Sequence, residues 1–553
     1  MRTTTLPALL IAALLAGCAA PPRDAGPLQV KVIAINDFHG NLKPPASGLR
    51  IRDPQDRSKT VDIPAGGAEH LASAVRELRA KNPNSVFVAA GDLVGASPFL
   101  SALFHDEPTI EALGLMGLEA SAVGNHEFDH GRVELLRQQQ GGCHPKDGCR
   151  GPKPFTGARW QYLAASTLDT ATGRTLFPPY VIKRFEGIPV AFIGLTLKET
   201  PAIVVPSGVA GLQFRDEVQT VNALVPELKR QGIEAIVVLI HEGGSPTGDY
   251  DECPGISGAI VGIVEKLDPA VDLVVSGHTH RAYNCRIAGR LVTSADKYGT
   301  IVTEIDLTLD RKTGDVTQAR AGNVIVRPER FAKDAAQTAL IATYEARAAP
   351  LAQRVVGRLA APLSRDENAA GEMPLGRVIA DAHLAATKAP ADGGAQIAFT
   401  NPGGVRAPLA GRPDGTVTYE QLFTVQPFSN NLVTMTLTGA QLRTVLEQQW
   451  AGQPRDRVMQ ASRGFSYTWD AARPSGQRVV EGSLAIDGKP IAPGDPVRVT
   501  VNVYMADGGD NFTVFRDGTD RRTGIIDVDA LEQFVQATPV LAVDAQPRIR
   551  RLN

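Results

Sequence analysis

Five short polar clusters hold the residues best suited to chemistry, and each of them follows an apolar run. The clusters are Asn36-Asp37-Phe38-His39-Gly40, Gly91-Asp92, Gly124-Asn125-His126-Glu127, His241-Glu242-Gly243-Gly244 and Gly277-His278-Thr279-His280. The runs before them are apolar and β-branched, as in strands that are covered on both faces. Ligands bind at the carboxyl ends of such strands in α/β sheets, so we expect the clusters to meet at one site.

The side chains of these clusters suit a pair of divalent metal ions. The expected ligands are Asp37, His39, Asp92, Asn125, His241, His278 and His280. In an extended segment, residues two apart point to the same side, which gives chelating pairs at positions 37 and 39 and at positions 278 and 280. Asp92 is expected to bridge the two ions, because its carboxylate has two oxygens to share. Mixed nitrogen and oxygen ligands favour manganese, zinc, iron or cobalt over calcium or magnesium.

The charge of such a centre predicts the kind of substrate. Four neutral imidazoles, two carboxylates and one amide leave two divalent ions with about two units of uncompensated positive charge, which suits a phosphate dianion. His126 follows the ligand Asn125, so its ring is expected to face the substrate, with Asp129 holding it as an imidazolium. His126 can then protonate the leaving oxygen while a water attacks phosphorus in line. Glu127 and His130 are expected to support the turn and the ligands.

Length and charge limit the class of protein. A chain of 553 residues is too long for one core, and two to four domains are expected at about 150 residues each. Lysine and arginine number 57 against 59 acidic residues, without a basic stripe. A polymeric nucleic acid is therefore not an expected partner. We expect a monomer.

The amino terminus has the features of a bacterial lipoprotein signal. A short apolar stretch, Leu6 to Leu15, leads into Leu15-Ala16-Gly17-Cys18, where cleavage would leave Cys18 as a lipid-modified terminus. The alternative is an ordinary secretory signal with an incidental cysteine. Either interpretation predicts export. Residues 19–27 have the composition of a flexible tether, and Ala19 after the cysteine favours an anchor in the outer membrane, facing the periplasm.

Four cysteines remain after Cys18, and an exported protein can form disulfides. Three pairings of Cys143, Cys149, Cys253 and Cys285 are possible. The short separation of Cys143 and Cys149 favours the pairs 143–149 and 253–285. A zinc site of four cysteines would need CxxC-like pairs, which this sequence does not contain.

The pattern along the chain predicts two α/β domains. Residues 1–27 form the signal and tether, and residues 28–327 alternate strand-like runs with amphipathic stretches, as in a layered α/β domain. Residues 328–354 are rich in alanine and charged residues and predict a linker helix. Residues 355–553 again mix helices with strands and form the second domain.

The metal-site clusters resemble those of the calcineurin-like metallophosphoesterases, and specifically the exported 5′-nucleotidases. Matching signatures in the second half are Asn401-Pro402-Gly403-Gly404-Val405-Arg406, Gln426-Pro427-Phe428-Ser429-Asn430 and Tyr504-Met505-Ala506-Asp507-Gly508-Gly509-Asp510. The resemblance covers nearly the whole mature chain. It implies a four-layer α/β sandwich that holds two metals, and a carboxyl-terminal α/β domain that binds the nucleotide and rotates to deliver it.

The resemblance also implies the roles of several residues in the second half. Phe428 and Tyr504 would clamp the base, Asp510 would bind the ribose hydroxyls, and Arg365, Asn401 and Arg406 would contact the substrate, the arginines its phosphate. Aromatic faces stack on any base, so broad base tolerance is expected. Glycines such as Gly403 and Gly404 would let the backbone approach the ligand.

The expected function is hydrolysis of nucleoside 5′-monophosphates. UDP-sugars or dinucleotides are further candidate substrates, and a 2′,3′-cyclic nucleotide phosphodiesterase and the thiohydrolases of sulfur oxidation are alternatives that share the metal core. From a different class, the chain could be a binding lipoprotein that kept the fold and lost turnover.

Overall fold

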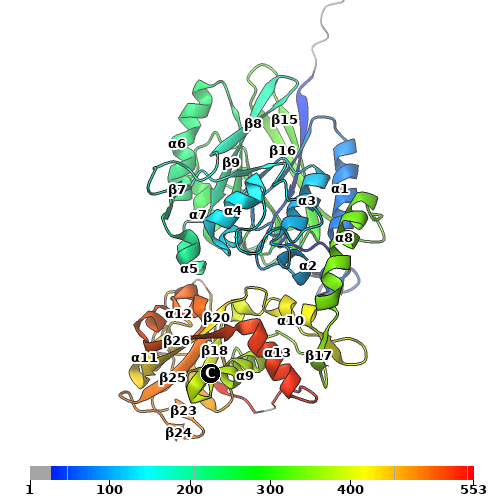
Figure 1. The fold of residues 1–553 in the computed structure, drawn as a ribbon. Coiled ribbons are helices and arrows are strands. Elements are labelled where there is room, and N and C mark those ends of the chain that lie inside the picture. The colour runs from blue at the N-terminus through cyan, green and yellow to red at the C-terminus, as the bar shows by residue number, and fades with distance from the viewer. Residues whose placement is uncertain (1–25, 47, 205, 454, 545) are drawn as a thin grey trace, which may run out of the picture.

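The structure is a computed structural model that describes residues 26–46, 48–204, 206–453, 455–544 and 546–553. Cys18 and the predicted signal lie outside the described residues. The chain forms two α/β parts that follow each other in sequence and lie one above the other in Figure 1. The prediction of a two-domain α/β protein is confirmed.

Two six-stranded sheets form the centre of the amino-terminal part. The first has the order β16 (Val316–Ile325), β15 (Ile301–Leu309), β1 (Leu28–Ile35), β4 (Ser85–Ala89), β5 (Ala120–Ala122) and β6 (Gln161–Leu163). The second has the order β13 (Ala282–Ile287), β14 (Arg290–Ala295), β12 (Leu273–Ser276), β11 (Ala235–His241), β9 (Ile188–Thr196) and β8 (Tyr180–Phe185). The central strands of both sheets run parallel, so their carboxyl ends share one edge.

The two sheets pack face to face, with helices on the outer faces. Val32 and Val88 of the first sheet share a buried cluster with Phe192 and Val237 of the second. On the other side of the first sheet lie α1 (Ala68–Ala80), α3 (Glu107–Met116) and α4 (Gly131–Gln140), and on the second sheet lie α6 (Glu217–Arg230) and α7 (Ala259–Lys266). These four layers explain why the sequence of the inner strands is almost wholly apolar.

The shorter elements of this part connect the layers. They are β2 (Leu49–Arg52), β3 (Thr60–Ile63), α2 (Phe99–Ala102), η1 (His126–Phe128), β7 (Thr167–Asp169), α5 (Thr200–Ile203), η2 (Pro206–Val209) and β10 (Leu212–Phe214). β2 pairs with β3, and β7 pairs with β10.

A five-stranded mixed sheet is the centre of the carboxyl-terminal part. Its order is β21 (Gln460–Ala461), β18 (Ile397–Thr400), β25 (Pro496–Asn502), β20 (Asn431–Thr438) and β26 (Thr519–Ile526). A smaller sheet has the order β24 (Lys489–Pro490), β23 (Ala485–Ile486), β22 (Phe465–Asp470) and β27 (Ile549–Leu552), and β17 (Val355–Arg358) pairs with β19 (Thr416–Thr418). The helices are α9 (Pro374–Thr387), η3 (Pro390–Asp392), η4 (Pro402–Gly404), α10 (Tyr419–Val425), α11 (Gly439–Glu447), α12 (Val503–Ala506), η5 (Gly509–Asn511), η6 (Thr513–Asp517) and α13 (Asp527–Ala537).

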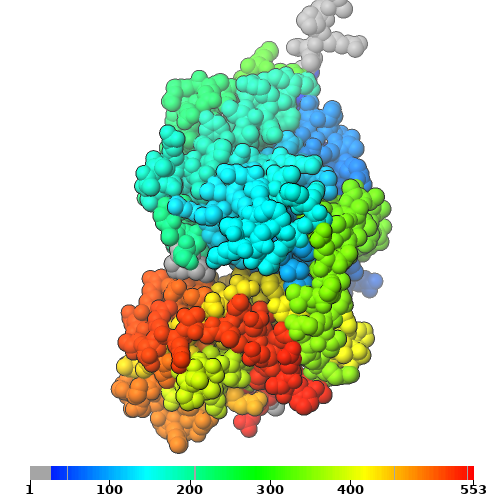
Figure 2. Space-filling model, viewed as in Figure 1, coloured from blue at the N-terminus to red at the C-terminus, as the bar shows by residue number. Residues whose placement is uncertain are grey.

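Helix α8 (Ala335–Ala352) runs along one side of the molecule and reaches both parts, as the green segment of Figure 2 shows. The sequence predicts a linker helix over residues 328–354, and the helix covers the later two thirds of that range. The two parts also meet through aromatic side chains. Phe99 of α2 lies edge-on to Tyr419 and Phe423 of α10, with ring centroids 5.6 and 5.3 Å apart.

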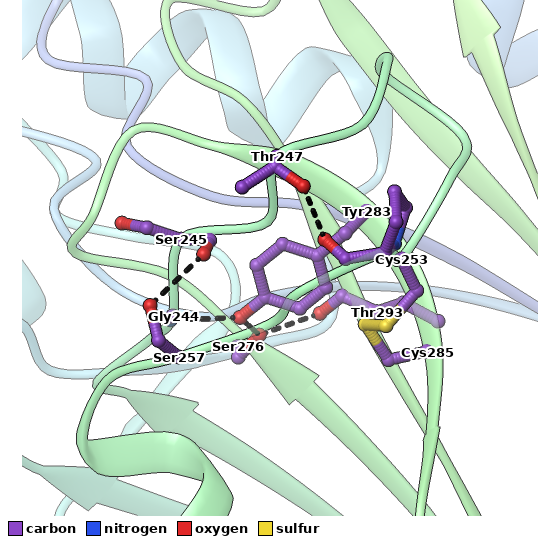
Figure 3. The surroundings of a disulfide bond; sticks show 10 residues. Gly244, Ser245, Thr247, Cys253, Ser257, Ser276, Tyr283, Cys285 and Thr293 are labelled. Carbon is purple, nitrogen blue, oxygen red and sulfur yellow. Dashed lines mark hydrogen bonds between the residues drawn. A yellow bond between two sulfur atoms is a disulfide. The ribbon is translucent and has the colours of Figure 1, made fainter.

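Two disulfides join the pairs Cys143–Cys149 and Cys253–Cys285. The second pair ties the loop after β11 to strand β13, beside a buried hydrogen-bond network (Figure 3). There the Tyr283 hydroxyl lies 2.8 Å from Ser276 Oγ and accepts a 3.2 Å hydrogen bond from the Gly244 backbone N–H. These contacts hold the two loops that carry His241 and His278. Among the described residues, none of the helices is long and apolar enough to cross a membrane.

Candidate dinuclear metal centre and active site

All five polar clusters meet at the shared edge of the two sheets. They follow β1, β4 and β5 in the first sheet and β11 and β12 in the second. The seven side chains that the sequence singles out as metal ligands come together there, and all except His278 and His280 are almost fully buried. The edge of a parallel sheet is where backbone groups and loop side chains converge on a ligand.

The backbone that presents these ligands is not extended. The φ angles are 51° at Asp37, 46° at His39, 50° at Asp92, 70° at His278 and 54° at His280. Asp37 and His39 do meet, but through left-handed turns rather than through the two-residue alternation expected from the sequence. The structure separates the pair expected at positions 278 and 280, because His280 joins Asp37 and His39 whereas His278 joins Asp92 and His241. Left-handed backbone at residues other than glycine is costly, and such positions cluster at functional sites.

The first group of ligands consists of Asp37, His39 and His280. Nε2 of His280 lies 3.3 Å from Oδ1 of Asp37 and 3.2 Å from Nε2 of His39. Nε2 of His39 lies 3.9 Å from the same Asp37 oxygen. These atoms face one small volume from three sides, and they form one of the clusters that could hold a metal ion.

The second group consists of Asp92, Asn125, His241 and His278. Oδ1 of Asn125 lies 3.2 Å from Nε2 of His241 and 3.0 Å from Nδ1 of His278. Oδ2 of Asp92 lies 2.9 Å from Nε2 of His241. The same Asp92 oxygen lies 3.6 Å from Nε2 of His39, so this carboxylate stands between the two groups.

The donor set fits two divalent ions. Each group offers imidazole nitrogens and at least one oxygen, the mixture that zinc, manganese, iron and cobalt accept. Burial lowers the pKa of His278 to about 3, so this imidazole is neutral and has a lone pair for a metal. Burial also acts on His241, but the Asp92 carboxylate raises its pKa to about 10, so an ion would displace a proton there.

Hydrogen bonds to neighbouring groups fix the orientation of the predicted metal ligands. The Nδ1 atoms of His39 and His241 lie 2.9 and 2.8 Å from the backbone carbonyls of Gly95 and Ala90, which leaves each Nε2 facing the centre. Nδ2 of Asn36 donates to Oδ2 of Asp37 over 2.6 Å. Carbonyl and amide partners of this kind set the tautomer and direction of metal-binding side chains.

Glu127 joins the loops that carry the ligands Asp92 and Asn125. Its carboxylate accepts hydrogen bonds from the backbone N–H groups of Asp92, Leu93 and Gly124, at 2.9, 2.8 and 2.6 Å. Gly91 is required beside it, because its φ is +84° and a Cβ there would lie 2.7 Å from the Gly124 nitrogen. The supporting role that the sequence predicts for Glu127 matches these contacts.

His126 lies beside the metal ligands and pairs with Asp129. Its Nδ1 lies 2.9 Å from Oδ2 of Asp129, and its ring centroid lies 5.0 Å from that of His39. Burial lowers the pKa of His126, but the carboxylates of Asp129 and Asp92 raise it more, so the net shift is upward. The free Nε2 of an imidazolium in this place can give a proton to an oxygen bound near the ligands.

Phe428 and Arg406 of the carboxyl-terminal part reach this centre. The ring of Phe428 stacks over His126 with centroids 5.8 Å apart, and the Arg406 guanidinium lies 5.7 Å from the Phe428 centroid. Nη1 of Arg365 donates to the Arg406 carbonyl over 2.8 Å. The structure therefore brings these three residues of the carboxyl-terminal part to the side that faces the predicted metal centre.

Tyr504, Asn401 and Asp510 lie in a separate cluster. The Asp510 carboxylate accepts hydrogen bonds from the Tyr504 hydroxyl at 2.9 Å and from Asn401 Nδ2 at 2.7 Å, and it pairs with Arg457. Arg457 was not recognised from the sequence, since nothing marks an arginine in a polar loop as a partner of Asp510. Both Asp510 oxygens have protein partners, so a ribose would have to share or replace them.

Gly403 and Gly404 lie beside the side chain of Asn401. A Cβ at Gly404 would lie 2.8 Å from Oδ1 of Asn401, and a Cβ at Gly403 would lie 3.4 Å from Nδ2 of the same residue. The role expected of Gly403 and Gly404, to let the backbone approach a ligand closely, stays a prediction.

Comparison with known proteins identifies the class. Residues 30–282 match the calcineurin-like phosphoesterase family, and residues 355–517 match the 5′-nucleotidase carboxyl-terminal domain. The chain is 30% identical over 545 residues to the cell wall protein Lmo0130 of Listeria monocytogenes, covering 92% of this chain and 68% of that protein. It belongs to the 5′-nucleotidase family of phosphoesterases, with a metallophosphoesterase domain and a 5′-nucleotidase carboxyl-terminal domain.

Two further relatives show the range of the family. The chain is 32% identical over 518 residues to endonuclease YhcR of Bacillus subtilis, covering 93% of this chain but only 40% of that protein. The fold superimposes on the 5′-nucleotidase precursor of Thermus thermophilus with a TM-score of 0.76 and 25% identity, covering 95% of this chain and 100% of that one. YhcR and Lmo0130 are therefore longer proteins than this chain.

Proposed function

We propose that this protein hydrolyses nucleoside 5′-monophosphates to nucleosides and phosphate, with two divalent metal ions held by the seven ligands. The observation that carries the proposal is the position of Phe428. Its ring lies over His126, so an aromatic surface for a base and a proton donor for an ester oxygen face the same metal centre. A phosphatase that acts only on small esters would have no need of an aromatic surface for a base.

Asp37, His39 and His280 would hold one ion, and Asn125, His241 and His278 the other, with Asp92 shared between them. Two ions bound there would supply the positive charge that stabilises the phosphoryl group as negative charge develops on it. His126, held by Asp129, protonates the leaving oxygen, which would otherwise depart as a strongly basic alkoxide. Arg406 and Arg365 bind the phosphate oxygens as guanidinium donors.

The base and ribose would be bound by the carboxyl-terminal part. Phe428 and Tyr504 offer aromatic faces, and each base–aromatic contact contributes about 1–3 kcal/mol. Asp510 and Asn401 would receive the ribose hydroxyls through a rearrangement of their present hydrogen bonds. The amino-terminal domain would comprise residues 28–327 and the carboxyl-terminal domain residues 355–553, with 328–354 as the linker.

A second candidate function is cleavage of substrates that carry another phosphate, such as UDP-sugars, dinucleotides or nucleic-acid ends. A series of cations leads away from the metal centre. Burial and the nearby guanidiniums of Arg406 and Arg455 lower the pKa of Arg365. Burial and the guanidiniums of Arg457 and Arg281 lower the pKa of Arg455 in the same way. Within the described residues, Arg365, Arg406 and Arg455 have no carboxylate within ion-pairing distance. The name of the relative YhcR, an endonuclease, keeps nucleic acid among the substrates to test.

We infer that the protein is exported and carries lipid on Cys18, with the anchor in the outer membrane. Two disulfides fit an oxidising compartment, and the relative Lmo0130 is named a cell wall protein. A lipid-precursor label should be incorporated by the wild-type chain and not by Cys18→Ser. Label in the variant would contradict the anchor.

The function is tested by phosphate release from a panel of AMP, UDP-glucose, NAD, 2′,3′-cyclic AMP and a short DNA, and by sulfate release from a thiosulfonate. An added phosphomonoesterase reveals cleavage that first yields a monoester. Fast, chelator-sensitive release from AMP without the added enzyme supports the main proposal. Release that needs the added enzyme supports the second candidate, and silence of the metal-loaded protein on all substrates would support a binding protein.

A further inference from the structure

A sixth loop lies at the same edge of the two sheets as the five polar clusters. It spans residues 296–300, follows β14 in the second sheet and leads into β15 in the first. β14 runs parallel to β12, so its carboxyl end lies beside the end of β12 that precedes His278. Tyr298 of this loop is not among the residues that the sequence indicates for the site.

The backbone of Tyr298 is held in a conformation that aromatic residues rarely adopt. Its φ angle is 59°, in the left-handed region. Its N–H donates to the carbonyl of Asp37 over 2.7 Å, and a Cβ at Gly66 would lie 3.0 Å from its carbonyl oxygen. Bulky side chains at positive φ are uncommon, and such positions cluster at functional sites. We therefore expect the Tyr298 side chain to have a role in the site.

The ring of Tyr298 packs against both histidines of the first ligand group. Its centroid lies 5.9 Å from that of His39 and 5.8 Å from that of His280, and the ring planes are inclined by 73° and 67°. The rings of His39 and His280 lie 5.1 Å apart at 67°. Aromatic rings attract one another in such edge-to-face arrangements. The ammonium group of Lys297 lies 5.6 Å from the Tyr298 centroid, within the range of a cation–π contact.

The imidazole of His280 depends on this packing more than the other ligands do. The Nδ1 atoms of His39 and His241 are held by backbone carbonyls at 2.9 and 2.8 Å. Within the described residues, the polar contacts of the His280 ring are all at Nε2, with His39 and Asp37. Its side chain is also 24% exposed, whereas those of His39 and Asp37 are fully buried. Packing must therefore fix the direction that hydrogen bonds fix at the other histidines.

We propose that Tyr298 is a positioning residue for the first metal group, whose aromatic ring holds His39 and His280 so that both Nε2 atoms face one ion. The inference rests on the dinuclear centre of the proposed function. It requires the ring of Tyr298 and not its hydroxyl. Removing the ring should weaken binding of the first ion, whereas the ion of the second group, built around His241 and His278, should stay bound as before.

Two variants separate the ring from the hydroxyl. Tyr298→Phe keeps the ring, and Tyr298→Asn removes it while introducing a residue that tolerates left-handed backbone. The full mature chain is freed of metal by chelation and equilibrated with a series of free Co²⁺ concentrations, and bound cobalt is counted by elemental analysis. Wild type and Tyr298→Phe should bind two ions alike. In Tyr298→Asn, one ion should need about 10- to 100-fold more free Co²⁺, the usual effect of losing a group that orients a ligand.

Two ligand variants identify the ion that is affected. His280→Asn removes a ligand of the first group and His278→Asn one of the second, and asparagine suits the φ angles of 54° and 70° at these positions. In His278→Asn the tighter ion belongs to the first group, and adding Tyr298→Asn should weaken it. In His280→Asn the tighter ion belongs to the second group, and adding Tyr298→Asn should leave its affinity unchanged. A general loss of stability would instead weaken both ions.

The visible absorption of bound Co²⁺ adds a measurement that does not depend on activity. It reports coordination geometry, so the spectrum of His278→Asn should change when Tyr298→Asn is added and not when Tyr298→Phe is added. Wild-type affinity for both ions in Tyr298→Asn, equal weakening of both ions, or a Tyr298→Phe variant as weak as Tyr298→Asn would overturn the inference. Wild type that binds fewer than two ions would instead contradict the dinuclear centre itself.

Discussion

His126 and Asp129 form a pair at the rim of the metal centre, with Nδ1 of the imidazole 2.9 Å from Oδ2 of the carboxylate. The pair leaves Nε2 of His126 for the substrate. Replacing His126 by asparagine should lower kcat by about 10²- to 10⁴-fold, the usual contribution of a general acid. Metal content, measured by elemental analysis, should not change. Activity near the wild-type level would rule out His126 as the proton donor.

Asp129 should control the pH range of the reaction. Burial lowers the pKa of His126, but Asp129 and Asp92 raise it above its usual value. A general acid must be protonated, so kcat should fall as the pH rises through that raised pKa. Asp129→Asn removes one of the charges that raise it, and the alkaline fall should move to lower pH. A pH profile of kcat for both proteins tests this, and coincident profiles would contradict it.

Phe428 should matter more for nucleotides than for small esters. Replacing Phe428 by alanine should lower kcat/KM for AMP by the equivalent of about 1–3 kcal/mol, the value of one stacking contact. The value of kcat/KM for a simple aryl phosphate should fall much less. Because the ring also packs on His126, an equal loss on both substrates would show that Phe428 acts by positioning the histidine rather than by binding a base.

Arg455 should distinguish substrates with a second phosphate from monophosphates. It lies among the cations that lead away from the centre, since the charges of Arg457 and Arg281 act on it. Arg455→Ala is expected to reduce kcat/KM for UDP-glucose roughly tenfold, equivalent to about 1.4 kcal/mol, with little change for AMP. Arg463→Ala, which removes an exposed arginine paired elsewhere, is the matched control. Equal effects on the two substrates would remove the second-phosphate interpretation.

Glu127 should stabilise the fold as well as the site. It accepts three backbone hydrogen bonds from the loops that carry Asp92 and Asn125. Glu127→Ala leaves these buried N–H groups without partners and should lower the free energy of unfolding by at least about 2 kcal/mol. Glu127→Gln retains one acceptor oxygen and should lose less. Urea unfolding of the metal-free proteins measures both, and an unchanged midpoint in the alanine variant would contradict the role.

The sequence by itself determined the α/β layers of the fold and which side chains gather at the sheet edge as the predicted metal ligands. Apolar β-branched runs specify buried parallel strands, and the carboxyl ends of such strands gather whatever polar residues follow them. This local rule places Asp37, Asp92 and His241 at one edge, although they are far apart in the chain. Amphipathic stretches over residues 69–81 and 216–230 likewise form α1 and α6, whose ends agree with these bounds to within one residue.

Tertiary structure alone decided how these groups face one another. The left-handed turn at Asp92 depends on contacts such as the Glu127 hydrogen bonds and the close approach of Gly91 to Gly124, which no periodic pattern of the sequence announces. The same is true of the pairing of Arg457 with Asp510. Such contacts join residues that are distant in the chain, so their energies appear only when packing has brought both partners to one place.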